Sequence, residues 1–326
     1  MDHFVTLFDS MFLPMGLNLY VSLKKNSPSF KLWVLCLDDQ VYETLIKLQL
    51  PDIGLIKLEE IETPELLKVK SGRSRAEYCW TLTPFTFTCV FSKDTTVQQI
   101  TYVDADLYFF GNPRILIDEM VIARKDVLIT EHAYDPQYDA SANSGRFCVQ
   151  FLTVNNTSYA LSVIKWWQER CIEWCFCKFE IDRFGDQKYL DKWPMLFGET
   201  VHIVQAKHRT LAPWNAAYFS KRNAGEPVFF HYHGLRILHA NRIRLYYGFY
   251  IGNKAQLYYD RYVESMNLVV GFIDAHGIIR TSVSKAKNPE HFGKRGIFSL
   301  LKCIMNVYVT KIEKYVWLTP QPVSSL

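Results

Sequence analysis

The stretch Ile100-Thr-Tyr-Val-Asp-Ala-Asp-Leu-Tyr-Phe-Phe110 decides the fold class of this chain. An apolar run ends abruptly in Asp104 and Asp106, and a second apolar patch follows. Carboxylates at i and i+2 leave a strand end on the same side, close enough to share one divalent cation. Because α/β sheets bind nucleotides at the carboxyl edge of their strands, the pattern predicts a metal–nucleotide site there. The tripeptide alone is weak evidence, since a chain of this length contains about one Asp-x-Asp by chance.

The residues around this stretch alternate predicted strands with predicted helices. In the first half, strands are expected at 4–8, 30–37, 53–58 and 100–103, and helices at 13–25, 39–48 and 74–91, the last kinked at Pro84. In the second half, strands are expected at 127–130, 147–154, 201–205 and 228–232, and helices at 158–175 and 186–192. The βαβαβ order predicts an α/β fold with a mostly parallel central sheet flanked by helices.

Composition indicates a large folded domain in which positive and negative side chains nearly balance. Of the 326 residues, 49% are hydrophobic and 15% aromatic, which is enough for a large core. Lys and Arg number 37 against 33 Asp and Glu, so the formal charge of +4 is far from the balance of a nucleic-acid-binding protein. No stretch reaches ~18 uninterrupted apolar residues, so no membrane span is expected. The N-terminus also lacks the layout of a signal peptide.

The eight cysteines lie mostly within apolar segments, which is typical of reduced, packed thiols and favours a cytoplasmic location. Cys171, Cys175 and Cys177 are close in sequence, but no His or second Cys pair has zinc-finger spacing. We therefore interpret these three as part of a Trp-rich amphipathic helix and not as a metal site.

Residues 254–326 are predicted to form a helical, basic C-terminal extension. It would follow a catalytic domain of residues 1–253, with a nucleotide-binding half at about 1–115 and an acceptor half at about 116–253. The basic and apolar side chains of the extension are Lys285, Lys287, Lys294, Arg295 and Lys302 with Phe298, Leu300, Leu301, Ile304 and Met305. A solvated charged helix face would explain this pattern, and so would peripheral contact with an anionic membrane surface.

Two further segments carry groups that could serve a diphosphate or a sugar. Arg73 and Arg75 precede the Asp104 strand, where a guanidinium could neutralise phosphate or pair with a nearby carboxylate. Asp186 and Gln187 stand at a predicted helix start, where Asp186 could also act as a simple N-cap.

A second metal-ligating segment stands far from Asp104 in the sequence. His231 and His233 flank Tyr232 and precede Gly234 at the end of a predicted strand. Side chains at i and i+2 of a strand project to the same side, so a third metal ligand is available here. A lone histidine would more often be a core or surface residue, but a pair beside a glycine turn favours a ligand.

Taken in order, these segments resemble bacterial GT-A-type nucleotide-sugar glycosyltransferases, and among them the family-8 enzymes most. The resemblance covers roughly residues 1–240. It implies contact of Asp9 with the nucleotide base, and of Arg75, or alternatively Arg73, with the diphosphate. It implies that Asp104, Asp106 and His231 bind Mn²⁺ or Mg²⁺, with the two carboxylates also touching ribose and diphosphate. It further implies that Asp186 and Gln187 lie beside the donor sugar as the catalytic pair.

The resemblance also implies an activity. It favours metal-dependent transfer of a hexose from a nucleotide-diphosphate sugar, expected to be UDP-linked, to a glycan or glycolipid acceptor, with retention of configuration. The setting would be bacterial surface polysaccharide assembly in the cytoplasm, with possible peripheral attachment at the inner face of the membrane.

The chain departs from the family at two places. Where the family has an Asn-x-Gly strand facing the donor sugar, this chain has Phe147-Cys-Val-Gln-Phe151, and no Lys-Pro-Trp follows Gly234. Donor sugar and stereochemical outcome therefore stay open. Gln150, Trp214 and His233 are the remaining candidates for lining the sugar or the acceptor, Trp214 because aromatic faces stack on sugar rings or, alternatively, fill a core.

Three alternatives compete with a glycosyltransferase. A sugar-1-phosphate nucleotidyltransferase would need a glycine-rich loop after its first strand, but residues 6–16 contain one glycine, Gly16. A haloacid-type phosphatase would place its Asp-x-Asp near the N-terminus. A catalytically inactive sugar-nucleotide-binding or scaffold protein would have no need of the complete set of Asp104, Asp106, Asp186, Gln187 and His231.

Overall fold

The computed structural model describes residues 1–222, 225–281 and 312–326. A seven-stranded sheet with the order β3-β2-β1-β4-β7-β6-β8 forms its centre. The strands are β1 (Asp2–Phe8), β2 (Phe30–Cys36), β3 (Ile53–Lys57), β4 (Gln99–Val103), β6 (Val127–Glu131), β7 (Phe147–Asn155) and β8 (Val201–Ile203). Strands β1 to β4 run parallel, as do β6 and β8, and only β7 runs antiparallel to its neighbours. The predicted α/β fold with a mostly parallel sheet is therefore confirmed.

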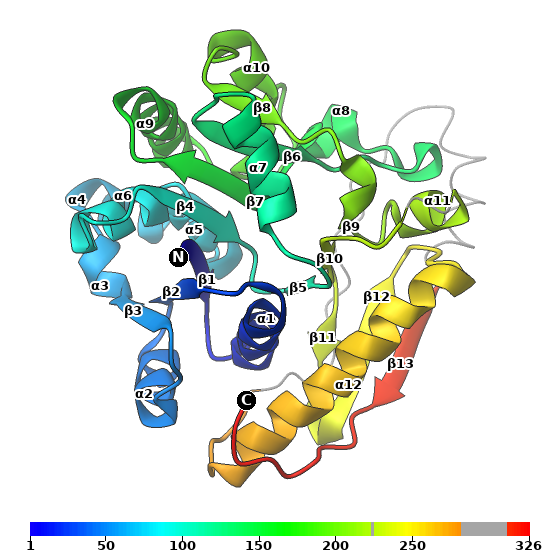
Figure 1. Ribbon diagram of the computed structural model, residues 1–326. Coiled ribbons are helices and arrows are strands. Elements are labelled where there is room, and N and C mark those ends of the chain that lie inside the picture. Colours follow the sequence, from blue (N-terminus) through cyan, green and yellow to red (C-terminus); the bar gives the residue numbers. More distant parts are fainter. Residues whose placement is uncertain (223–224, 282–311) are drawn as a thin grey trace.

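Helices cover both faces of this sheet (Figure 1). Two hydrophobic clusters flank it, one including α1 and α12 and the other including α5, α6 and α9. The longer helices are α1 (Leu13–Asn26), α2 (Asp39–Leu48), α4 (Pro64–Lys70), α5 (Arg75–Leu82), α6 (Phe85–Lys93), α7 (Arg114–Ile122), α9 (Ser158–Glu173), α11 (Ala216–Lys221) and α12 (Asn253–Ala275). The shorter ones are α3 (Leu58–Ile61), α8 (Ser141–Ser144), α10 (Trp193–Leu196), η1 (Pro136–Tyr138), η2 (Gln187–Lys192), η3 (Lys207–Arg209) and η4 (His239–Asn241).

Strand β2 shows why the sheet is buried on both faces. Leu32 and Val34 belong to the cluster of α1, whereas the alternate residues Trp33 and Leu35 belong to the cluster of α5 and α6. A strand that is apolar at successive positions can be stable only between two layers, because its side chains alternate between faces. Each such fully buried side chain contributes about 1.5–3 kcal/mol.

Three predicted helical segments differ from the structure in detail. In the extension predicted to be helical at 254–326, the helix α12 (Asn253–Ala275) is present, but Glu313–Trp317 forms the strand β13. The segment 74–91 forms two helices, α5 and α6. The helix is interrupted at Thr83-Pro84, because Pro84 has no N–H to donate. Ser74 and Glu77 form a capping box that fixes the start of α5. The predicted helix at 186–192 is the 3-10 helix η2, whose tighter turns suit a short connector.

Two three-stranded sheets extend the central one. Strands β5 (Leu107–Phe109), β10 (Phe229–His231) and β9 (Thr210–Leu211) form the first, and β11 (Arg236–Ile237), β12 (Arg242–Tyr247) and β13 (Glu313–Trp317) form the second. Figure 1 shows α12 running alongside the second small sheet. The Ser265 hydroxyl of α12 donates to Asn18 of α1 at 2.6 Å, so α12 is joined to the first cluster by polar contact as well as by packing.

The C-terminal segment crosses α12 at a glycine. A Cβ on Gly271 would stand 1.8 Å from the carbonyl oxygen of Gln321, so only glycine allows this close approach of the two backbones. The amide of Thr319 donates to the Asn267 side chain at 2.8 Å. The proposed domain boundary at residue 253 stays a prediction. The proposed membrane contact also stays a prediction, because the basic and apolar residues of the extension lie outside the described residues.

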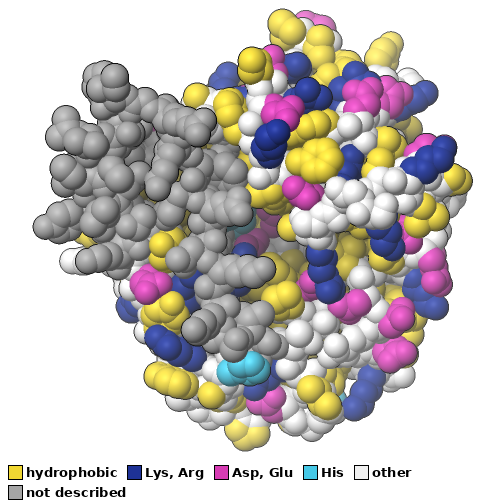
Figure 2. Space-filling view, turned by 180° about the vertical axis from the view of Figure 1, so that it is seen from behind, with side chains coloured by type: hydrophobic (Ala, Val, Ile, Leu, Met, Phe, Trp, Pro, Cys, Tyr) yellow, Lys and Arg dark blue, Asp and Glu magenta, His cyan; other side chains and the backbone are white. Residues whose placement is uncertain are grey.

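Within the described ranges, no helix has both the length and the apolar character needed to cross a lipid bilayer. The face in Figure 2 carries Lys and Arg side chains interspersed with Asp and Glu among apolar ones. This mixture agrees with the small net charge, and the described part of that face carries no large patch of one charge sign.

Candidate metal and nucleotide site

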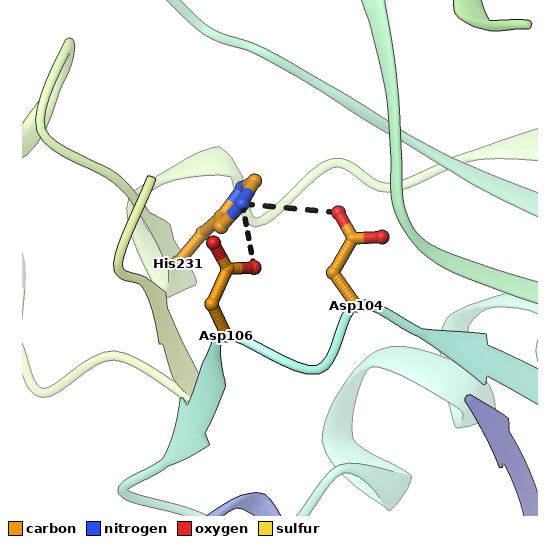
Figure 3. Close-up of side chains that lie close together, drawn as sticks. All are labelled: Asp104, Asp106 and His231. Carbon is orange, nitrogen blue, oxygen red and sulfur yellow. Dashed lines mark ion pairs between the residues drawn. The ribbon is translucent and has the colours of Figure 1, made fainter. Parts of the chain in front are cut away.

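Three side chains converge at the carboxyl end of β4 (Figure 3). The Nε2 atom of His231 lies 3.1 Å from Oδ1 of Asp106 and 3.7 Å from Oδ2 of Asp104. His231 and Asp106 are mostly buried, with 7% and 13% of their side chains exposed, whereas Asp104 is 29% exposed and opens toward solvent. The cluster is therefore enclosed by protein at His231 and Asp106 and open to solvent at Asp104.

Strand pairing brings His231 to the two carboxylates. After Asp104 and Asp106 the chain enters β5, which pairs antiparallel with β10 so that His231 stands opposite Leu107. The amide of Tyr232 donates to the carbonyl oxygen of Asp106 at 2.9 Å, which continues the ladder beyond β5. Two segments far apart in the sequence are thus fixed by backbone hydrogen bonds, independently of any metal.

Gln150 orients the His231 ring. Its amide oxygen lies 2.7 Å from Nδ1 of His231, and the Gln150 side chain is buried in β7. An amide oxygen can only accept, so Nδ1 carries a proton and Nε2 is the atom directed at Asp104 and Asp106. A partner that fixes the ring through its second nitrogen is the usual support of a metal-ligating histidine.

The three groups shift one another's pKa through their charges. Burial raises the pKa of Asp104 to about 6, although the His231 charge opposes this rise. Burial also acts upward on Asp106, but the charge and hydrogen bond of His231 outweigh it and lower the pKa of Asp106 to about 2. The pKa of His231 lies well above its ordinary value because the Asp106 and Asp104 carboxylates outweigh the effect of burial.

This donor set fits a divalent cation. Two ligand atoms that bind one cation at right angles, each at about 2.1 Å, lie about 3 Å apart. The separations of 3.1 and 3.7 Å between His231 and the two carboxylates are close to this value, and all three ligand atoms lie within 4.8 Å of one another. Two carboxylate oxygens and one imidazole suit Mn²⁺ or Mg²⁺ better than they suit a cation that prefers sulfur.

Asp186 lies near this cluster and is buried. Burial, followed by the charge of Asp104, raises the pKa of Asp186 to about 8. Its side chain makes no capping hydrogen bond with the first turn of η2. Gly185 turns the chain at φ +53° immediately before it, packed against Trp80, so a side chain there would be strained.

Gln187 is directed elsewhere. Its side-chain amide donates to the carbonyl oxygen of Ser144 at 2.8 Å, which ties η2 to α8. The structure thus brings Asp186 to the carboxylate cluster, while the predicted place of Gln187 beside a donor sugar stays a prediction.

A second cluster occupies the ends of β1 and β2. Arg75 bridges Oδ2 of Asp9 and Oδ2 of Asp38, each at 2.8 Å. Asp9 also accepts from the amides of Met11 and Phe12, which fixes the turn into α1. Because the Arg75 side chain is 58% exposed, a ligand at this edge could reach it.

Arg73, the alternative for the diphosphate contact, points away from this edge. Its guanidinium donates to the Thr81 hydroxyl and to the carbonyl oxygen of Ile172 near the end of α9. The order β2-β1-β4 places the Asp9–Arg75 cluster next to the Asp104 cluster along the sheet edge.

Arg236 is a charged residue of the site that sequence reasoning missed. Burial lowers the pKa of its guanidinium, while Asp106 and Asp9 raise it and Arg244 lowers it further. Arg236 therefore lies within electrostatic reach of both acidic clusters. The available signal was a basic residue two positions after Gly234, where the family's Lys-Pro-Trp is absent.

Aromatic side chains surround the other side of His231. The ring of Trp214 lies 5.5 Å from that of His231 and 5.6 Å from that of His233, measured between centroids. Trp214 is buried and donates to the carbonyl oxygen of His132 at 2.7 Å, so its contacts are those of a core aromatic. His132 stacks on Tyr134, and burial lowers the pKa of His132 to about 3. The predicted sugar-lining roles of Gln150, Trp214 and His233 stay predictions.

Comparison with known protein sequences identifies two relatives of the chain. The chain is 34% identical over 216 residues to the uncharacterized protein YfnD of Bacillus subtilis (strain 168), covering 65% of this chain and 68% of YfnD. It is 28% identical over 240 residues to the uncharacterized protein YfnF of the same organism, covering 69% of this chain and 79% of YfnF. No family model matches the chain.

Among solved structures, the fold is similar to that of the galactosyltransferase LgtC in complex with donor and acceptor sugar analogs. The TM-score is 0.52 at 14% identity, and the match covers 81% of this chain and 95% of LgtC. The chain therefore has the GT-A-type fold.

Proposed function

The chain belongs to the family of the Bacillus subtilis protein YfnD, and we propose that it is a metal-dependent glycosyltransferase that uses a nucleotide-diphosphate sugar. The observation that carries this proposal is the convergence of Asp104, Asp106 and His231 at the carboxyl edge of a GT-A-type sheet. A scaffold protein would have no need of two acidic groups held against a histidine at this edge, because such a cluster is costly unless a cation joins it.

Asp104, Asp106 and His231 would hold the cation, which when bound supplies positive charge to the diphosphate leaving group. Arg236 and Arg75 would bind the phosphates and neutralise charge that develops as the glycosidic bond breaks. Asp186 would accept hydrogen bonds from hydroxyl groups of the donor sugar, and Gln187 would turn toward the anomeric carbon. A UDP-linked hexose, a glycan or glycolipid acceptor, retention of configuration and a role in surface polysaccharide assembly are the finer parts of the proposal.

A screen of nucleotide sugars tests the proposal. Purified protein is mixed with Mn²⁺ and with UDP-, GDP- or CMP-sugars in turn, and its thermal unfolding is measured with and without the metal. A true donor at 100 times its dissociation constant should stabilise the fold by ~2.7 kcal/mol. Metal-dependent release of the nucleoside diphosphate from that donor should follow. Binding without release would favour the sugar-nucleotide-binding protein, and neither binding nor release would contradict both.

Replacing Arg236 with methionine should weaken binding of UDP in the presence of Mn²⁺. Methionine keeps an unbranched apolar stem but removes the guanidinium, and a hydrogen bond to a charged group contributes about 1.5–3 kcal/mol. The dissociation constant measured by calorimetry should therefore rise about 10- to 100-fold.

The matched control is Arg222→Met, because Arg222 is exposed and its side chain donates to the Tyr218 carbonyl oxygen. Equal affinities of the two variants for UDP would remove Arg236 from the proposed diphosphate site.

A further inference from the structure

The two carboxylate oxygens of Asp104 have different partners. Tyr102 stands two residues before Asp104, on β4, and its hydroxyl donates to Oδ1 of Asp104 at 2.9 Å. The other oxygen, Oδ2, is the one that faces His231, 3.7 Å from Nε2 (Figure 3). One oxygen of Asp104 is therefore held by a tyrosine of its own strand, and the second is directed at the metal position.

Tyr102 is itself firmly placed in the fold. Its backbone lies inside the central sheet, opposite Val5 of β1 and Leu152 of β7. Its ring is 3% exposed and packs in the cluster of α5 and α6, 6.5 Å from the ring of Phe87 between centroids. Asp104, in contrast, is the most exposed of the three proposed ligands. A fixed hydroxyl thus orients the ligand that the surrounding protein encloses least.

This hydrogen bond limits how Asp104 can bind a cation. To bind through both oxygens, the carboxylate would have to turn Oδ1 away from Tyr102, and the buried hydroxyl would lose this acceptor at a cost in free energy. With Oδ1 held, Asp104 supplies one oxygen, Oδ2. Ca²⁺ takes about six to eight oxygen ligands, often from carboxylates that bind through both oxygens, whereas Mg²⁺ requires compact octahedral geometry. Octahedral sites also suit Mn²⁺.

We propose that Tyr102 is a positioning residue that restricts Asp104 to binding through one oxygen and thereby makes the site select Mn²⁺ or Mg²⁺ over Ca²⁺. The proposal rests on the proposed function for the metal site and adds the residue that sets the choice of cation. An imidazole ligand such as His231 also favours Mn²⁺ over Ca²⁺, but this preference does not depend on the Tyr102 hydroxyl. The change in selectivity when that hydroxyl is removed therefore isolates the effect of Tyr102.

The experiment is a competition between Mn²⁺ and Ca²⁺, without nucleotide, for the wild type and for Y102F, which keeps the buried ring and removes the hydroxyl. Electron paramagnetic resonance measures free Mn²⁺, so the Ca²⁺ needed to displace bound Mn²⁺ gives the ratio of the two affinities. Loss of a group that orients a metal ligand typically weakens binding about 10- to 100-fold, and this is expected for Mn²⁺. Ca²⁺ affinity should stay equal or rise, because Asp104 can then bind through both oxygens. The ratio of Mn²⁺ to Ca²⁺ affinity should therefore fall at least about 10-fold.

The control is Y20F. Tyr20 is also buried, on α1 in the other hydrophobic cluster, and its hydroxyl has no hydrogen-bond partner among the described residues. Y20F should keep the Mn²⁺ affinity and the selectivity of the wild type, and circular dichroism should show both variants folded. A crystal structure of the wild type with Mn²⁺ tests the same point without a substitution, and Asp104 should bind through Oδ2 alone while Oδ1 keeps its bond to Tyr102.

The outcomes separate the choice of cation from the proposed function. A wild type that binds no Mn²⁺ overturns the metal site and the role of Tyr102 together. A wild type that binds Mn²⁺ but no nucleotide sugar contradicts the proposed function and leaves the role of Tyr102 standing. If Y102F keeps the wild-type ratio, or if Mn²⁺ in the crystal is bound by both oxygens of Asp104, Tyr102 does not select the cation, and the proposed function is unaffected.

Discussion

Asp106→Asn is expected to reduce sugar transfer by roughly three orders of magnitude while the chain stays folded. Asparagine keeps the volume of the side chain and an oxygen but removes the charge that a divalent cation requires. The carboxylate is held ionised by His231, which lowers the pKa of Asp106 to about 2, so its full charge is present at neutral pH. The backbone hydrogen bond from Tyr232 to Asp106 does not depend on the side chain, and the loop should keep its shape.

The measurements are release of the nucleoside diphosphate and Mn²⁺ affinity. The control is Asp118→Asn on α7, which removes a carboxylate that is 52% exposed and pairs with Arg114. Activity and Mn²⁺ affinity of this control should equal those of the wild type. If chelator-treated wild-type protein keeps its full rate, or if Asp106→Asn transfers sugar normally, the metal-dependent mechanism is wrong.

Asp186→Asn is expected to lower turnover by orders of magnitude without destabilising the fold. A bound cation would offset the Asp104 charge that helps to raise the pKa of Asp186, so the side chain would ionise in the donor complex. A hydrogen bond from a sugar hydroxyl to that carboxylate is stronger than one to an amide, and the difference grows in a buried site. Because the Asp186 side chain does not cap the first turn of η2, the substitution costs no helix cap. Turnover per folded molecule, measured with a donor found in the nucleotide-sugar screen, reports the effect.

The same substitution has a signature in the pH dependence of stability. Burial and the Asp104 charge raise the pKa of Asp186 to about 8 from its ordinary value of 3.8. Between these values the folded chain holds a proton that the unfolded chain releases, so stability should fall as pH rises through this window. Asparagine has no such proton, and Asp186→Asn should gain stability relative to the wild type as pH rises through the same window in denaturant titrations.

Asp182→Asn is the matched control for both readouts. Asp182 is 68% exposed and has a positive φ of 64°, a conformation that asparagine also tolerates. It should change neither turnover nor the slope of stability with pH. Equal slopes for wild type and Asp186→Asn would show that Asp186 is ionised in the folded chain, and unchanged turnover would remove Asp186 from the donor site.

Local pattern was enough for much of the fold. The apolar run of β2, the Asp38 cap of α2 and the break at Pro84 follow from the residues themselves, because burial on two faces, capping and the missing proline N–H act within a few positions. η2 is the exception, since its sequence does not distinguish a 3-10 helix from a short α-helix.

In the candidate site, too, some features follow from local sequence and others depend on tertiary contacts. Asp104 and Asp106 could be predicted because an i, i+2 pair at a strand end is a local feature. His231 could be named as a partner from its own strand end, but its distance from Asp106 depends on the pairing of β5 with β10. Gln150 was expected near a sugar, and in the structure its amide oxygen contacts Nδ1 of His231.

The sequence by itself determined which chemistry is present: two carboxylates after a strand, a His-Tyr-His segment, and a buried α/β core to carry them. Only the tertiary structure decided which groups act on one another. Nε2 of His231 lies 3.1 Å from Oδ1 of Asp106, and Arg75 bridges Asp9 and Asp38, because strands and helices far apart in the chain meet there. Covalent neighbours fix strand ends and caps, whereas side-chain contacts across a sheet edge depend on packing that no single segment encodes.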